Sequence, residues 1–107
     1  MKGPSPRLPP RLRIGPTVFT LERAASTEDK AGFSDMWRQR IVVSDELAPE
    51  TAAITVVHEV LHVLLRPLDL DGDSEERICG VLGVGLLDLL RRNPALVRFL
   101  TEGVNDG

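Results

Sequence analysis

The chain has 107 residues, of which 42% are hydrophobic and 27% are charged, and its formal net charge is −3. A chain of this length builds one small domain around a single core, and so mild a charge argues against a surface that binds nucleic acid throughout. The absence of Tyr and the single Trp argue against a base-stacking platform. Because Cys79 is the only cysteine, an internal disulfide and a Cys-x-x-Cys metal knuckle are excluded.

The N-terminal segment, residues 1–11, combines four prolines with basic residues. This composition is typical of a disordered or extended tail, and a weak contact with an acidic partner or nucleic acid is the functional alternative. The segment lacks the apolar stretch of a secretion signal. No run in the chain reaches the roughly 20 apolar residues of a membrane span. We therefore expect a cytoplasmic protein with no membrane partner and no specific nucleic-acid partner, and the sequence leaves its oligomeric state open.

The next segments predict a small sheet. Residues 12–24 contain apolar side chains around Gly15-Pro16, which indicates a first strand. Residues 25–35 are polar and predict a loop. Residues 36–44 end in Ile41-Val42-Val43, which predicts a second strand. We expect these segments to pair as a hairpin or small meander, an antiparallel sheet of two to three strands.

The second half of the chain predicts three helices. The first runs from near Pro49, which suits an early helical position, to Leu65 or Arg66, because Pro67 ends it. An acidic connector over 68–74 follows.

The second predicted helix covers Glu75–Arg92, with an apolar stripe at helical spacing. Its three glycines, Gly80, Gly83 and Gly85, weaken a helix, and their expected use is the close approach of another helix backbone. A last helix opens at Asn93-Pro94 and extends to Gly103. Together these elements predict a single α+β domain over residues 12–107.

The motif that carries chemistry is His58-Glu59-Val60-Leu61-His62 in the first helix. The two histidines are the only ones in the chain, and at this spacing they project from one helix face. Two neutral imidazoles placed in this way can bind one zinc ion, and Glu59 can polarise a metal-bound water. The rest of the helix is apolar, so each unpaired polar group there would cost about 1–3 kcal/mol, and a metal removes that cost. The alternative is a structural helix with two satisfied histidines and no metal.

A third zinc ligand has to be a carboxylate, because a catalytic zinc usually takes three protein ligands and the chain has no third histidine. The best candidates open the second helix. Glu75 shares the inward stripe of Ile78 and Leu82, so we favour Glu75 as the ligand. Glu76 lies on a weaker inward stripe and is the alternative.

The motif, followed by a glutamate that opens the next helix, resembles the gluzincin arrangement of zinc metallopeptidases. The short length resembles the minimal forms, including the ImmA/IrrE-type and small phage-encoded metallopeptidases, and the resemblance covers about 41–100. It implies a minimal zincin-like fold, in which the sheet packs on the motif helix and two C-terminal helices. It also implies Zn²⁺ on His58, His62 and Glu75, and hydrolysis of a peptide bond in a protein or peptide by a metal-activated water with Glu59 as general base.

The chain departs from that family in two respects. Only 12 residues separate His62 from Glu75, a shorter spacer than gluzincins usually show. The family's usual Tyr or further His is absent, so the transition state would be stabilised by a backbone N–H, by an arginine such as Arg40, or by no additional group. The strand through Ile41-Val42-Val43 is expected to hold an extended peptide at a sheet edge. The alternative function is a non-catalytic zinc-binding module with an interaction or regulatory role.

Overall fold

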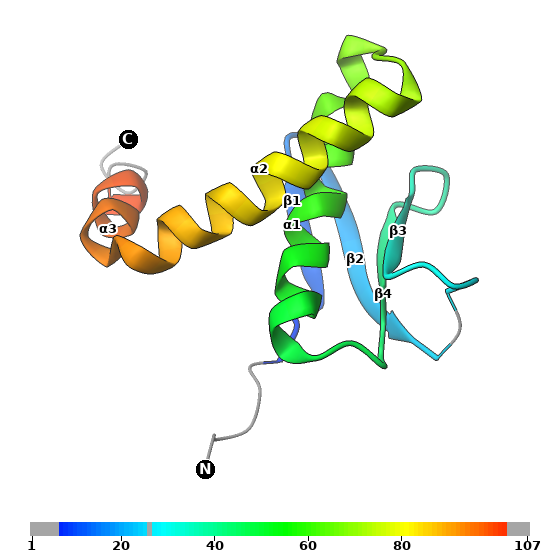
Figure 1. Cartoon of the computed structure of the whole chain (residues 1–107), viewed down its shortest axis with the longest axis horizontal. Helices are drawn as coiled ribbons and strands as arrows, with labels where there is room; N and C mark the ends of the chain where they lie inside the picture. Colours follow the sequence, from blue (N-terminus) through cyan, green and yellow to red (C-terminus); the bar gives the residue numbers. More distant parts are fainter. Residues whose placement is uncertain (1–6, 26, 103–107) are drawn as a thin grey trace.

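A computed structural model describes residues 7–25 and 27–102, and the fold is α+β (Figure 1). Four strands form one mixed sheet: β1 (Arg11–Ile14), β2 (Thr17–Ala24), β3 (Gly32–Asp35) and β4 (Arg40–Ser44). Three α-helices follow in this part of the chain: α1 (Pro49–Leu65), α2 (Gly72–Arg92) and α3 (Pro94–Glu102). A 3₁₀ turn, η1 (Arg66–Leu68), joins α1 to α2.

The sheet has the strand order β1-β2-β4-β3, so the prediction of two to three antiparallel strands is wrong in number and direction. β1 and β3 each pair antiparallel with a neighbour, whereas β2 and β4 are parallel. The predicted first strand is two strands, because Gly15 adopts a φ of +62° and turns the chain back on itself. After β2 the chain crosses to the far edge of the sheet and forms β3. It then returns as β4, which lies between β2 and β3 and runs parallel to β2.

Three local boundaries also differ from the prediction. The polar segment 25–35 contains β3, a short edge strand without apolar alternation, which explains why its composition indicated a loop. The segment 36–39 is the β3–β4 turn, with Gln39 at a φ of +51°, so β4 begins only at Arg40. Arg11, assigned to the tail, is the first residue of β1. Residues 1–6 of the predicted tail lie outside the described residues.

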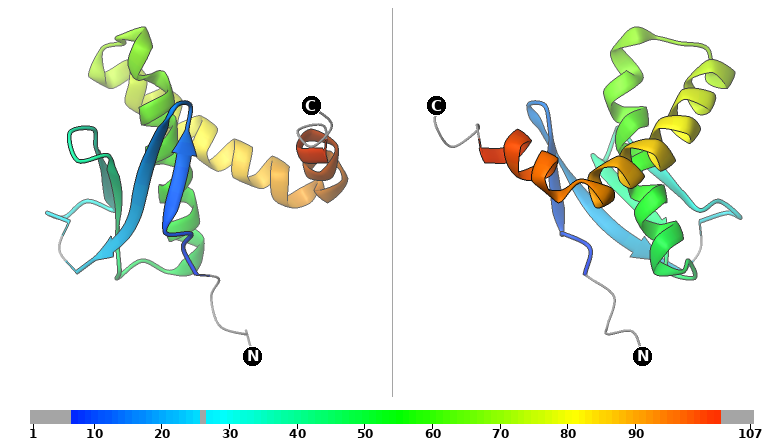
Figure 2. Two further views of the ribbon diagram at one scale, coloured as in Figure 1. Left: turned by 180° about the vertical axis from the view of Figure 1, so that it is seen from behind. Right: turned by 60° about the vertical axis from the view of Figure 1, so that its left-hand side comes forward.

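The core lies between one face of the sheet and α1 (Figure 2). β2 alternates at its centre, where Phe19 and Leu21 are buried while Val18 and Thr20 on the opposite face are exposed. These two side chains pack with the buried residues of β4 and α1, namely Ile41, Val43, Ala52 and Val63. By length and composition alone, Pro49–Leu68 could cross a membrane. Here this helix packs between the sheet and α2.

α2 crosses α1 on the side away from the sheet. Gly83 is the contact point: a Cβ there would lie 3.6 Å from the backbone N and Cα of His58. The predicted close approach of helix backbones is therefore confirmed at Gly83, whereas Gly80 and Gly85 face open space. α2 begins at Gly72, before the predicted Glu75, because the Asp71 side chain accepts a hydrogen bond from the backbone N–H of Ser74 and caps the helix.

The end of α1 agrees with the sequence. The helix ends at Leu65, and Pro67 lies in the η1 turn that follows. α3 ends at Glu102 within the described residues, and the predicted end at Gly103 lies outside them. Beyond its crossing with α1, α2 projects from the body of the domain and carries α3 at its far end (Figures 1 and 2).

Candidate metal centre

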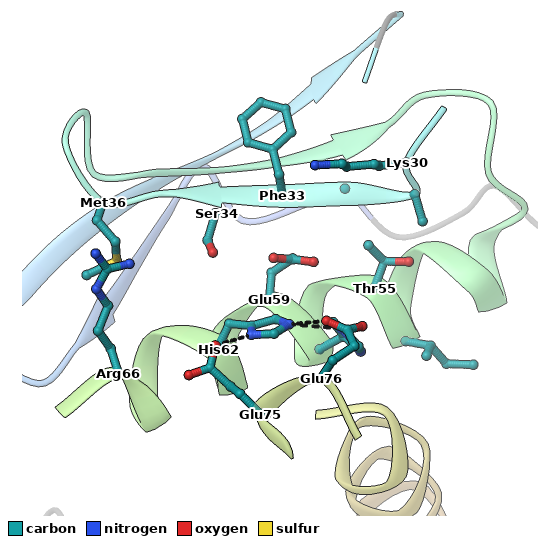
Figure 3. Close-up of a pocket in the computed structure, with 14 residues that line it drawn as sticks. Lys30, Phe33, Ser34, Met36, Thr55, Glu59, His62, Arg66, Glu75 and Glu76 are labelled. Carbon is teal, nitrogen blue, oxygen red and sulfur yellow. Dashed lines mark hydrogen bonds and ion pairs between the residues drawn. The ribbon is translucent and has the colours of Figure 1, made fainter. Parts of the chain in front are cut away.

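The two histidines of the motif meet as the helix spacing predicts. Their Nε2 atoms lie 3.2 Å apart, and their ring centroids are separated by 4.9 Å. Both rings line a cavity of about 620 Å³ bounded by β3, α1 and the first turn of α2, and Figure 3 shows the ring of His62 at this cavity. The structure therefore brings His58 and His62 together at one accessible point.

Glu76 faces the same ring nitrogens. Its Oε1 lies 2.8 Å from Nε2 of His58, and its Oε2 lies 2.9 Å from Nε2 of His62. The carboxylate thus spans both rings from the side of α2. Its side chain remains 62% exposed, so it closes the cavity only partly.

Glu75 approaches His62 from another direction. Its Oε2 lies 2.7 Å from Nδ1 of His62, and its side chain is 23% exposed. The two glutamates therefore take different places around one ring: Glu75 meets Nδ1, and Glu76 meets Nε2. The two glutamates are neighbours in sequence, yet each contacts a different nitrogen of the His62 ring.

Glu59 is buried at 8% exposure on α1, next to the histidines. One ligand atom from each of His58, Glu59 and His62 lies within 4.8 Å of the others. Burial raises the pKa of the Glu59 carboxyl, and the neighbouring imidazoles of His62 and His58 oppose that shift. Ser34 of β3 also favours the ionised form through its hydroxyl, which points into the cavity from the opposite wall (Figure 3).

The pKa of His62 reflects its acidic neighbours. Burial of the ring favours the neutral form, but the hydrogen bonds to Glu75 and Glu76 and the charge of Glu59 outweigh it, so the pKa is raised. Three carboxylates and two imidazoles thus share one cavity. A cluster of this composition is stabilised by a cation, whether a proton on a ring or a metal ion.

The geometry of the cluster fits zinc. Two nitrogens bound to one tetrahedral zinc at about 2.0–2.1 Å would lie about 3.3 Å apart, close to the 3.2 Å between the two Nε2 atoms. Two imidazoles and a carboxylate are also a donor set that zinc takes. Both rings already present Nε2 to the same point, so binding requires the Glu76 carboxylate to move back from the two nitrogens rather than a rearrangement of α1.

Two sequence-based expectations around the cavity are wrong. Arg40 lies on β4 and pairs with Asp35 and Glu22, outside the residues that line the cavity. The arginine that lines it is Arg66, which follows His62 by one helical turn and could have been found by that spacing.

The edge strand beside the cavity also differs from the prediction. β4, with Ile41-Val42-Val43, is an interior strand between β2 and β3. β3 is the edge strand, and its residues Gly32, Phe33 and Ser34 form the wall of the cavity opposite α1. Sequence reasoning missed this wall because it treated the segment as a loop.

Comparison with known proteins gives no match: no protein-family model, no curated protein and no solved structure is similar to this chain. The geometry of the described residues is therefore the basis for any functional assignment.

Proposed function

We propose that this protein is a zinc-dependent metallopeptidase with a zincin-like site, in which Glu59 acts as general base. The observation that carries the proposal is the convergence of His58 Nε2 and His62 Nε2 at 3.2 Å beside a buried glutamate. A buried acid next to two imidazoles, open to a cavity, is an arrangement typical of a catalytic centre rather than of a packing core.

For the third ligand we favour Glu76 over Glu75, the residue that the sequence stripe favoured. The contacts of Glu76 support this choice, because its two oxygens lie at the Nε2 atoms that both rings direct into the cavity. Glu75 instead meets Nδ1 of His62. An outer carboxylate at that position fixes the tautomer of a ligating histidine and makes the ring a better donor. We therefore assign Glu75 a positioning role.

Zinc in such a site supplies a Lewis acid that makes water acidic near neutral pH and polarises a carbonyl group. The residues of the chain supply the proton transfer. Glu59 accepts a proton from the attacking water, and its raised pKa makes it a stronger base than an exposed carboxylate. After the C–N bond breaks, Glu59 can return that proton to the leaving amine.

The substrate we propose is an extended segment of a protein or peptide. β3 is a sheet edge whose backbone borders the cavity, so a substrate strand can pair with it and lie across the histidines. Arg66, at the Met36 end of the cavity, replaces Arg40 as the cation within reach of a substrate carbonyl or carboxylate (Figure 3). We place the activity in the cytoplasm, where a lone buried thiol such as Cys79 stays reduced.

The experiment combines metal content with turnover. The protein is purified without added metal, its zinc content is measured by elemental analysis, and hydrolysis of a mixed peptide library is followed by mass spectrometry. We expect about one zinc per chain, cleavage that a chelator abolishes, and recovery of cleavage when zinc is restored.

Glu59→Gln is the matched control, because it should retain zinc while losing at least about 100-fold in turnover. Zinc binding without cleavage in either protein would instead support the non-catalytic zinc-binding module. Absence of zinc under conditions that retain weakly held metal would overturn both readings.

A further inference from the structure

Arg66 lines the cavity without a counter-ion in the part of the chain that the structure describes. It follows His62 by four residues and its backbone is still helical, so its side chain leaves the same side of the helix as His62. Glu75 and Glu76, which line the same cavity, are paired with the histidine rings. The exposed guanidinium of Arg66 is therefore a positive charge that a bound molecule can neutralise.

Arg66 and Met36 mark one end of the cavity. Met36 directly follows β3, and the two side chains point toward each other across this end (Figure 3). His62 and Ser34 lie nearer the middle of the cavity, on the α1 wall and the β3 wall respectively (Figure 3). The two walls therefore run in the same direction, from the histidines to the guanidinium.

Both walls give the same distance from the histidines to this end. The four residues from His62 to Arg66 rise about 6 Å along a helix. The two residues from Ser34 to Met36 rise about 7 Å along a strand. An extended substrate paired with β3 advances about 3.3 Å per residue. The substrate residue level with Arg66 is therefore two positions from the peptide bond that lies at the histidines.

We propose that Arg66 makes this site selective for acidic substrates, with an aspartate or glutamate two residues from the cleaved bond. A planar guanidinium can bind a carboxylate through two parallel hydrogen bonds, which gives both charge and orientation. Because Arg66 is exposed, this end of the cavity is open and a peptide can continue past it, which favours a side-chain carboxylate over a chain terminus. The inference rests on the proposed function, since it names the substrate class of the same site.

Two other assignments fit the structure less well. Contact with the carbonyl oxygen of the cleaved bond would require the Arg66 guanidinium to point to the middle of the cavity, whereas it points toward Met36 (Figure 3). Lys30 also lines the cavity, but it lies four residues before Ser34, about 13 Å along an extended chain. Lys30 therefore does not reach the substrate position that Arg66 reaches.

Cleavage profiling of a peptide library tests the proposal. Both ends of every peptide are blocked, so that side chains are the only carboxylates. For the zinc-loaded parent protein we expect Asp and Glu to be enriched about fivefold two residues to one side of the cut, on the scale of an exposed ion pair. Arg66→Gln should abolish this enrichment, and Arg66→Glu should replace it with enrichment of Lys and Arg.

Arg77→Glu is the matched control, because it makes the same charge change at an exposed position of α2 outside the cavity. It should leave the profile unchanged, and circular dichroism verifies that all variants fold. Slower cleavage of every peptide by the Arg66 variants with an unaltered profile would overturn the proposal. So would an equal change of profile in Arg77→Glu, or an acidic preference that appears only when peptides carry a free C-terminal carboxylate.

Peptide binding tests the preference without turnover. Glu59→Gln is titrated with a fluorescent alanine-based peptide that carries one glutamate, and with the same peptide carrying glutamine instead. Fluorescence anisotropy should show about fivefold tighter binding of the glutamate peptide, and Arg66→Gln in the same background should remove the difference.

The two experiments separate this inference from the proposed function. An acidic preference in binding without any cleavage by the parent protein would remove the peptidase and keep Arg66 as a carboxylate-binding residue. Zinc-dependent cleavage without an acidic preference would keep the peptidase and overturn the inference. Equal affinity for the two peptides, or binding of neither, would also overturn it.

Discussion

Glu75 and His62 are hydrogen-bonded across the α1–α2 connection, with Nδ1 of His62 2.7 Å from Oε2 of Glu75. This contact involves the ring nitrogen that faces away from His58, and it leaves Nε2 directed at the cavity. The pair therefore constrains the orientation of a candidate ligand from outside the cluster. It also couples the first turn of α2 to the end of α1, so the geometry of the site depends on how the two helices pack.

Substitution of the two glutamates should separate a positioning carboxylate from a ligand. Glu75→Ala should lower zinc affinity about 10–100-fold, the usual effect of losing an outer carboxylate. Glu76→Ala should lower it further, because a direct ligand is lost. Competition against a chromophoric chelator measures both affinities. The reverse ranking would restore Glu75 as the ligand that the sequence favoured.

The motif could be predicted from sequence because its geometry is local. Residues four apart on a helix share a face, so the convergence of His58 and His62 follows from the helix alone. The stripe analysis placed both Glu75 and Glu76 towards the motif helix, but its ranking of the two stripes is wrong. α2 buries Cys79 and Gly83, on the stripe of Glu76, whereas Leu82, on the stripe of Glu75, is 40% exposed. Which of them reaches Nε2 depends on where α2 crosses α1, and Gly83 determines that crossing. The position of this crossing depends on tertiary packing, so it cannot be predicted from the apolar pattern of either helix alone.

Gly83 should tolerate a methyl group but no larger side chain. A Cβ there would lie in ordinary contact with His58, at 3.6–3.7 Å, so Gly83→Ala should raise the free energy of unfolding by up to about 1 kcal/mol through helix propensity. Gly83→Leu should push α2 from His58 and cost about 1–3 kcal/mol. Urea denaturation measures both effects. Gly80→Leu, which faces open space, is the control for leucine on this helix, and equal losses at the two positions would contradict the close approach.

β3 could not be predicted from sequence for a related reason. Four residues at a sheet edge, all only partly buried, carry no apolar alternation. Their place in the sheet comes from pairing with β4, which aligns Phe33 with Val42. Likewise, the parallel pairing of β2 and β4 arises from the path of the chain between them, and the residues of neither strand indicate it. The order of predicted strands and helices along the chain thus indicated the α+β class, while strand order in the sheet required non-local contacts.

Gly32→Ala should displace β3 from the cavity. A Cβ at this position would lie 2.6 Å from the Val42 carbonyl oxygen and 2.9 Å from Cγ2 of Thr55, and the first of these atoms is backbone. The strand must shift, so we expect a loss of about 1–3 kcal/mol in the free energy of unfolding. Thermal melts compare it with Gly72→Ala, whose new methyl meets nothing within 4 Å. An unchanged melting temperature for Gly32→Ala would show that β3 does not pack against α1 in this way.

Cys79 should be unreactive in the native protein. It is 0% exposed, and burial together with the nearby carboxylates of Glu75 and Glu76 raises the pKa of the thiol to about 11. A disulfide reagent at a pH of about 8 should therefore label Cys79 only after unfolding. Rapid labelling of the folded chain would contradict the burial.

The same pKa shift gives a pH dependence of stability. The unfolded chain loses the thiol proton near the ordinary pKa of 9.0, whereas the folded chain retains it up to about 11. The contribution of Cys79 is therefore fully present below pH 9.0 and is lost as the pH rises towards 11. Urea denaturation across this range should show a steeper fall in the free energy of unfolding for the parent protein than for Cys79→Ala, which has no thiol to ionise. Parallel curves for the two proteins would mean that the thiol ionises equally easily in the folded and unfolded states.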